Sequence, residues 1–92
     1  MRLYELVLVL RTSLSEADRK KLVDQVKKAL GDIKVTKEEE WGQKPLAYAI
    51  KKEMAGNYIL LHLEGEKGVP SEFETQLLRN DNILRHLLVR TK

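Results

Sequence analysis

The sequence predicts an α+β fold in which a four-stranded antiparallel sheet carries two helices on one face. Two observations predict it. The hydrophobic periods run in the order strand, helix, strand, strand, helix, strand. The runs at residues 6–10 and 58–61 are continuously apolar, and successive side chains of a strand point to opposite faces. Two helices cannot cover both faces of a sheet. We therefore expect one apolar face to be covered by something else.

Composition indicates one soluble domain spanning residues 1–92. The chain has no cysteine, which excludes disulfides and thiolate metal sites. Glu5 interrupts any signal-peptide core, and the apolar runs are far too short to span a membrane. We expect a cytoplasmic protein without membrane contact. Seventeen basic and fourteen acidic residues give a formal net charge of +3, a mild excess for a nucleic-acid binder.

The first half of the chain predicts a strand, a helix and a long second strand. Residues 3–10 form the first strand. Ser13 and Glu16 match a capping box that opens the helix, with Ser15 as an alternative cap. The helix has an apolar stripe at helical spacing and ends near Gly31; the stripe consists of Leu22, Val26, Ala29 or Leu30, and Ile33.

The second half predicts a hairpin, a short helix and a last strand. The second strand runs over about residues 34–51, and Pro45 makes it an edge strand or a bulged one. Residues 53–57 form the turn and residues 58–63 the third strand. Ser71 and Glu74 match a second capping box, and residues 83–89 form the last strand. In this topology the first and third strands are central.

Alternation along the strands predicts which side chains face the helices. The inward set is Tyr4, Leu6, Leu8, Leu10, Ile59, Leu61 and Leu63. Ala47 and Ala49 are small enough to lie under a helix. The outward set forms an exposed apolar patch: Val7, Val9, Leu46, Tyr48, Ile50, Tyr58 and Leu60. A register error of one residue would exchange the two faces. Monomers rarely expose a large apolar patch, so this set predicts a protein-partner interface.

Four motifs in order identify a family resemblance. They are Met1-Arg2-Leu3-Tyr4-Glu5 before an apolar strand, Trp41-Gly42 before Leu46-Ala47-Tyr48-Ala49-Ile50, Gly56-Asn57-Tyr58, and the run from Leu77 to His86. Over essentially its whole length the chain resembles bacterial ribosomal protein S-six of the small subunit. Each motif is weak, but their joint order and spacing make the resemblance specific.

The resemblance implies a ferredoxin-like fold and a structural role in the ribosome, without enzymatic activity. Family members bind 16S ribosomal RNA (rRNA) together with ribosomal protein S-eighteen, which packs on the sheet. No cofactor and no small-molecule substrate are implied. The matching partner contacts would include Leu46, Tyr48, Tyr58 and Leu60. The matching RNA contacts would be Arg2, Lys44, Arg85 and Arg90.

The chemistry of the cationic side chains supports the same RNA-binding set, with Lys92 added. Arginine presents a planar fork that matches phosphate oxygens. Trp41 either stacks on a base or anchors the start of the second strand. His62 and His86 lack metal-ligand spacing. Residues 38–40 are three glutamates, but they alternate faces on a strand and so cannot converge as an acid–base pair.

Three rival functions remain open. A small acyl-phosphate hydrolase has the same element order, but it needs a glycine-rich cradle where this chain has residues 11–15 without glycine. A sheet that binds single-stranded RNA would stack bases on aromatic residues of both central strands. Only Tyr58 fits this role, because Val7 and Leu60 are aliphatic. A homodimer would pair two open faces.

Overall fold

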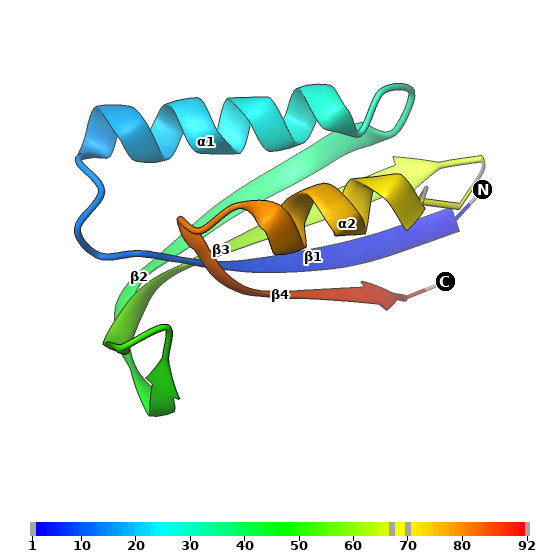
Figure 1. The fold of residues 1–92 in the computed structure, drawn as a ribbon. Coiled ribbons are helices and arrows are strands. Elements are labelled where there is room, and N and C mark those ends of the chain that lie inside the picture. Colours follow the sequence, from blue (N-terminus) through cyan, green and yellow to red (C-terminus); the bar gives the residue numbers. More distant parts are fainter. Residues whose placement is uncertain (1, 67, 70, 92) are drawn as a thin grey trace.

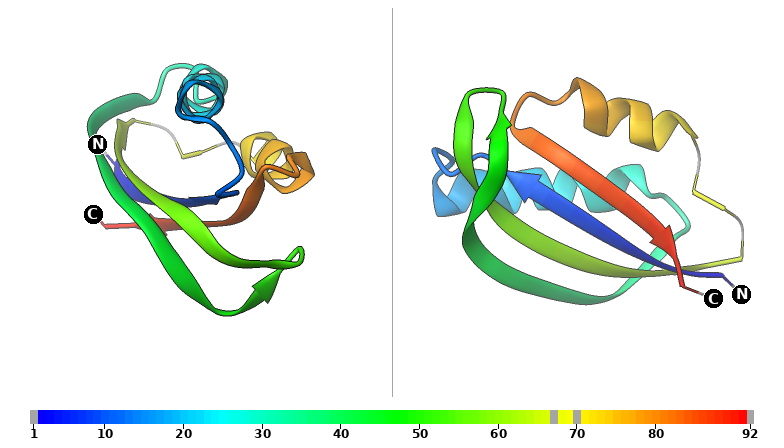
Figure 2. Two further views of the ribbon diagram at one scale, coloured as in Figure 1. Left: turned by 90° about the vertical axis from the view of Figure 1, so that its left-hand side faces the viewer. Right: turned by 90° about the horizontal axis from the view of Figure 1, so that it is seen from below.

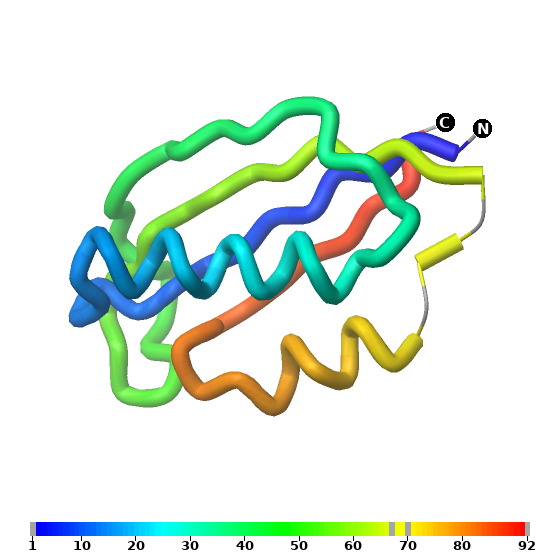
Figure 3. Tube along the Cα trace, turned by 90° about the horizontal axis from the view of Figure 1, so that it is seen from above, coloured from blue at the N-terminus to red at the C-terminus, as the bar shows by residue number. Residues whose placement is uncertain are grey.

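The computed structural model describes residues 2–66, 68–69 and 71–91. The elements follow the order β1 (Arg2–Leu10), α1 (Glu16–Ala29), β2 (Lys34–Ile50), β3 (Glu53–Gly65), α2 (Ser71–Arg79) and β4 (Ile83–Arg90). The strands form one antiparallel sheet in the order β2-β3-β1-β4. Both helices lie on the same face of it (Figures 1 and 3). This confirms the predicted ferredoxin-like α+β fold, with β1 and β3 central.

The core lies between the sheet and the two helices. Residues opposite one another in neighbouring strands share a face, and Leu6 is opposite Leu61 of β3 and Leu88 of β4. All seven side chains predicted to face the helices are buried there. The helices contribute Leu22, Val23, Val26, Leu30, Phe73 and Leu77. Burial of each large apolar side chain stabilises the fold by about 1.5–3 kcal/mol.

The ends of α1 are set by one serine and one glycine. Ser15 is the N-cap, and its Oγ accepts a hydrogen bond from the backbone N–H of Asp18 at 3.1 Å. The prediction of Ser13 as the cap is therefore wrong, and the alternative, Ser15, is confirmed. Gly31 follows the C-cap with φ of 63°, the left-handed conformation that ends a helix and suits glycine.

The second predicted capping box is also wrong. Ser71 is the first residue of α2 rather than the residue before it. Glu74 does not turn back toward the helix N-terminus, because its Oε1 lies 3.4 Å from Nε2 of His86 on β4. This contact joins α2 to the strand beneath it. No helix in the described ranges is long and apolar enough to cross a membrane.

The turn between β2 and β3 lies at Lys51 and Lys52, not at the predicted residues 53–57. Both lysines have positive φ, 49° and 68°, as a tight hairpin turn requires. Gly56 belongs to β3 and serves a different purpose. A Cβ built on Gly56 would lie 2.3 Å from Cγ1 of Val9 and 3.6 Å from Cδ1 of Leu84. The glycine therefore lets the side chain of Val9 pack directly against the β3 backbone.

The end of the β2–β3 hairpin bends away from the helices. The regular register between β2 and β3 stops at Pro45, and beyond it the ladder pairs Ile50 with Glu53. The edge position and the irregularity predicted from Pro45 are thus confirmed. In Figures 1 and 2 the hairpin end turns to the side of the sheet opposite the helices. Ala47 and Ala49 are exposed, so the prediction that they lie under a helix is wrong.

Candidate functional site

The sheet face opposite the helices, called here the open face, carries an apolar row across three strands. Val7 of β1 is opposite Leu60 of β3 and Leu87 of β4. One step along the strands, Glu5 is opposite His62 and Val89. Neither helix covers this face, as the right-hand view of Figure 2 shows.

The most exposed apolar side chains of the open face on β4 were not among the predicted site residues. Leu87 is 50% exposed and Val89 is 43% exposed. The signal was present in the sequence, because Arg85, Leu87 and Val89 alternate with residues that face the helices. These two positions extend the apolar surface to the β4 edge.

The predicted apolar patch is only partly exposed. Tyr48 is 61% exposed, whereas Val7, Leu46, Ile50 and Tyr58 are half-buried. Two members are buried, so the prediction that they are exposed is wrong: Val9 at 3% and Leu60 at 6%. Val9 is covered by the backbone of Gly56, and Leu60 lies on a central strand between Val7 and Glu39.

A shallow groove crosses the open face between β3, β1 and β4. Its lining combines an apolar floor with one cation, Arg85, and consists of Val7, Val9, Tyr58, Arg85, His86 and Leu87. Arg85 is opposite Val9 in the register, and its Nη1 donates a long hydrogen bond of 3.4 Å to the hydroxyl of Tyr48. The groove therefore suits an apolar side chain flanked by a hydrogen-bond acceptor or an anion.

The predicted RNA-binding cations do not form one cluster. Arg2 and Arg90 lie at the end of the sheet where the chain begins and ends, and Arg90 is opposite Tyr4 on the helix side. Arg85 lies on the open face, five residues away along β4, or roughly 17 Å at about 3.3 Å per residue. Lys44 lies on β2, and Lys92 is outside the described residues. The cations thus occupy three separate places.

Trp41 lies outside the core, with 45% of its surface exposed. The ammonium nitrogen of Lys44 sits 5.3 Å from the centre of the indole ring, within the range of a cation–π contact. These two side chains form a small cationic and aromatic surface on the β2 edge.

The comparisons with known proteins agree on one family. The model of the family described as "Ribosomal protein S6" matches residues 3–90 of the chain. The chain belongs to the ribosomal protein S6 family. A relative in Clostridioides difficile, "Small ribosomal subunit protein bS6", is 37% identical over 97% of this chain and 98% of its own length. One of the same name in Acidiphilium cryptum is 40% identical over the whole chain and 60% of its own length.

The fold agrees with a solved member of the S6 family. The crystal structure of 30S ribosomal protein S6 from Thermotoga maritima superposes with a TM-score of 0.87 at 28% identity. The match covers 97% of this chain and 86% of that one. The family resemblance inferred from the four sequence motifs is therefore confirmed.

Two neighbouring glutamates of this S6-family member pair with basic side chains on opposite faces of the sheet. On the open face, Nε2 of His62 lies 2.9 Å from Oε2 of Glu39. This hydrogen bond, helped by the nearby Lys37 ammonium and opposed by desolvation, lowers the pKa of Glu39. Glu38 instead pairs with Lys27 of α1 on the helix side. Neighbouring glutamates thus point to opposite faces, as predicted.

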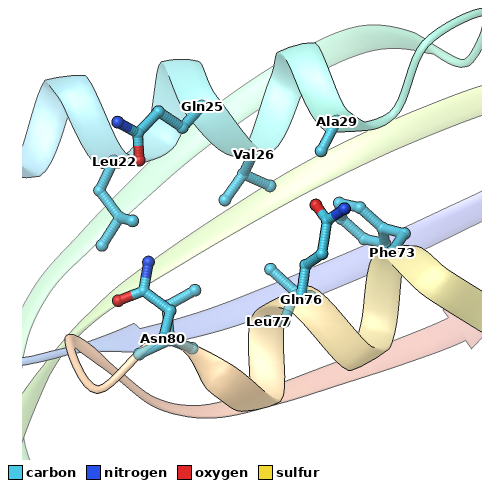
Figure 4. Close-up of a pocket in the computed structure, with 9 residues that line it drawn as sticks. Leu22, Gln25, Val26, Ala29, Phe73, Gln76, Leu77 and Asn80 are labelled. Atoms are coloured by element: carbon cyan, nitrogen blue, oxygen red, sulfur yellow. The ribbon is translucent and has the colours of Figure 1, made fainter.

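Side chains of the kinds that bind metal ions are scattered over the part of the chain that the structure describes. Within it, no group of three or more histidine, aspartate or glutamate side chains is arranged to hold a metal ion. A groove between α1 and α2 has an apolar floor and an amide rim (Figure 4). None of its nine lining residues is ionisable: Leu22, Gln25, Val26, Ala29, Phe73, Gln76, Leu77, Asn80 and Ile83.

Proposed function

We propose that this chain is a non-enzymatic, one-domain structural protein of the bacterial small ribosomal subunit, at work in translation in the cytoplasm. In this proposal it binds the central domain of 16S rRNA, and ribosomal protein S-eighteen docks on its open face. The family and the names of the relatives support the ribosomal part. The proposal of a protein partner is supported by the open face, where Leu87 and Val89 are about half exposed beside an apolar groove.

The chemistry of the open face favours a protein partner over stacked bases. Bases stack on aromatic rings placed next to one another. Here Tyr58 of β3 is opposite Val9 of β1, and the next open-face pair on these central strands is Leu60 with Val7, so both neighbours are aliphatic. A half-exposed leucine that becomes buried in an interface contributes about 1 kcal/mol. The exposed Tyr48 belongs to a residue type that is enriched among interface anchors, together with tryptophan and arginine.

RNA binding is proposed to use separated phosphate contacts. Arg85 occupies one end of β4, while Arg2 and Arg90 occupy the other end of the sheet. Such contacts position a protein on RNA without reading its sequence. With a net charge of only +3, we expect strong RNA binding only when a small basic partner adds its own cations.

The partner proposal is tested by two matched substitutions. Leu87→Asp places a charge on the open face, and Leu78→Asp places the same charge on exposed α2, where the leucine is 69% exposed. Calorimetric titration with purified S-eighteen should show at least tenfold weaker binding for Leu87→Asp, since a buried unpaired charge is costly. Leu78→Asp should bind like the parent. Equal affinities of the two variants would overturn the proposed interface.

Tyr48→Asp extends this test to the hairpin. The variant should lose binding to S-eighteen while its circular dichroism spectrum stays unchanged, because Tyr48 is exposed and outside the core. Unchanged affinity for the partner would remove Tyr48 from the interface.

The RNA proposal is tested by the salt dependence of binding. Arg85→Ala in the complex with S-eighteen should weaken binding to a 16S central-domain fragment. It should also reduce the slope of log K against log salt by about 0.7–0.9, the value for one lost phosphate contact. Arg79→Ala on α2 is the control, because it removes the same charge from the helix side. An unaltered slope for Arg85→Ala would exclude Arg85 from the RNA site.

A further inference from the structure

The end of the β2–β3 hairpin, residues 46–53 and called here the arm, is held mainly by contacts outside its own ladder. Past Pro45, the ladder between β2 and β3 resumes with the pair Ile50 and Glu53. The turn itself consists of two lysines with positive φ, a conformation that L side chains rarely adopt. Since Ile50 and Glu53 are the one register pair within residues 46–53, side-chain contacts outside the ladder contribute to the direction in which the arm points.

Arg11, at the end of β1, links the arm to the start of β4. Its Nη1 lies 3.1 Å from Oε1 of Glu53, and its Nε donates a hydrogen bond of 2.7 Å to the backbone oxygen of Asp81. The Arg11 and Glu53 side chains are only 25% and 27% exposed. The contact joins residues 42 positions apart in the sequence.

Lys51 makes a second link from the tip of the arm. Its Nζ donates a hydrogen bond of 3.2 Å to the backbone oxygen of Ile83, and it lies 3.9 Å from Oδ1 of Asp81. Two cations, Arg11 directly after β1 and Lys51 of the arm, thus converge on residues 81–83 just before and at the start of β4. The right-hand view of Figure 2 shows the arm reaching toward this point across the end of the sheet.

The arm also borders the groove on the open face. Tyr48 of the arm accepts the hydrogen bond from Arg85, which lines the groove. Three residues after the arm along β3, the backbone of Gly56 covers Val9, which forms part of the groove floor. A change in the direction of the arm would therefore change the shape of the groove.

We propose that Arg11 and Lys51 are positioning residues, which latch the arm onto the start of β4 and so fix the shape of the open-face groove before a partner binds. The latch itself is inferred from the contacts that Arg11 and Lys51 make within the free protein. The effect on a partner rests on the proposed function. Ion pairs at partly exposed positions are weakened by salt, so the latch is also expected to loosen as the ionic strength rises.

Nuclear magnetic resonance relaxation of the free protein tests the latch without a partner. In Arg11→Gln the backbone order parameters of the arm should fall below about 0.6, the range of flexible segments, while those of β1 and β3 stay near about 0.85. Glu53→Gln provides a second variant if Arg11→Gln folds poorly. Lys20→Gln is the control, because it breaks an exposed ion pair with Glu16 on α1. Raising salt from low to 1 M should loosen the arm of the parent protein.

Two results would overturn the latch: an arm that stays ordered in Arg11→Gln and Glu53→Gln, or one that loosens equally in Lys20→Gln. Binding to purified S-eighteen then tests the positioning role. We expect about three- to tenfold weaker affinity for the latch variants, since a loosened arm spends less time in the competent shape. A loosened arm with unchanged affinity would refute positioning. If the parent fails to bind S-eighteen, the proposed function fails, and the relaxation data still decide the latch.

Discussion

Replacement of Gly56 by alanine tests how the hairpin packs on the sheet. The new Cβ would lie 2.3 Å from Cγ1 of Val9, 3.4 Å from the carbonyl oxygen of Leu10 and 3.6 Å from Cδ1 of Leu84. Ordinary carbon–carbon contacts lie at about 3.5–4.0 Å. The two segments must therefore separate by about 1 Å, or Val9 must leave its side-chain position.

The expected cost follows from two opposing effects. Overpacking of a well-packed site costs about 1–3 kcal/mol. Alanine also restricts the unfolded chain, which returns about 0.4–1 kcal/mol. We expect a net loss of about 1–2 kcal/mol in the free energy of unfolding. For a domain of this size, that loss lowers Tm by roughly 4–16 °C, at about 4–8 °C per kcal/mol.

Urea unfolding of a double-mutant cycle with Val9→Ala measures this contact. Val9→Ala removes the methyl groups that the new Cβ would strike. In that background Gly56→Ala should cost less than about 0.5 kcal/mol, which gives a coupling of about 1 kcal/mol or more between the two sites. An equal cost in both backgrounds would refute the claim that Gly56 is needed for close approach to Val9.

Three further predictions concern the helix ends and one carboxylate. Ser15→Ala should lower the free energy of unfolding by about 1 kcal/mol because it removes the N-cap, whereas Ser13→Ala should change it by less than about 0.5 kcal/mol in the same urea titration. Gly31→Ala should lower it by about 1 kcal/mol through backbone strain alone, since no atom lies within 4 Å of the new Cβ; an unchanged Tm would contradict the assigned φ. The pKa of Glu39 is lowered from 4.5 by the hydrogen bond with His62, so its contribution is complete above that value and is lost as pH falls through the lower pKa of the folded state. Glu39→Gln should therefore reduce the free energy of unfolding at pH 6, and this loss should shrink steadily as the pH falls below 4.5; a difference independent of pH would contradict this account.

The order of elements and the core were predictable because they rest on local periodicity. The apolar runs of β1 and β3 identified the central strands, and alternation within them identified the side chains that face the helices. The position of the hairpin turn was not predictable in this way. Gly56 was interpreted as a turn residue, but the turn uses Lys51 and Lys52, whose positive φ has no signature in composition.

The open face was predicted as a surface, but its exposure pattern was not. Val9 is buried because the backbone of Gly56 lies against its side chain, and the contact brings together residues 47 positions apart in the sequence. No local pattern carries such information. Leu87 and Val89 are a different case, since the alternation of β4 already pointed them away from the helices.

The most direct test of the docking surface is a titration of the protein with purified S-eighteen, followed by nuclear magnetic resonance of the leucine and valine methyl groups. Our account predicts that the shifted signals include Val7, Leu87 and Val89 on the open face. Signals from Leu22 and Val26, in the groove between the helices, should stay unchanged. Shifts confined to the helix groove, with an unperturbed open face, would contradict the account.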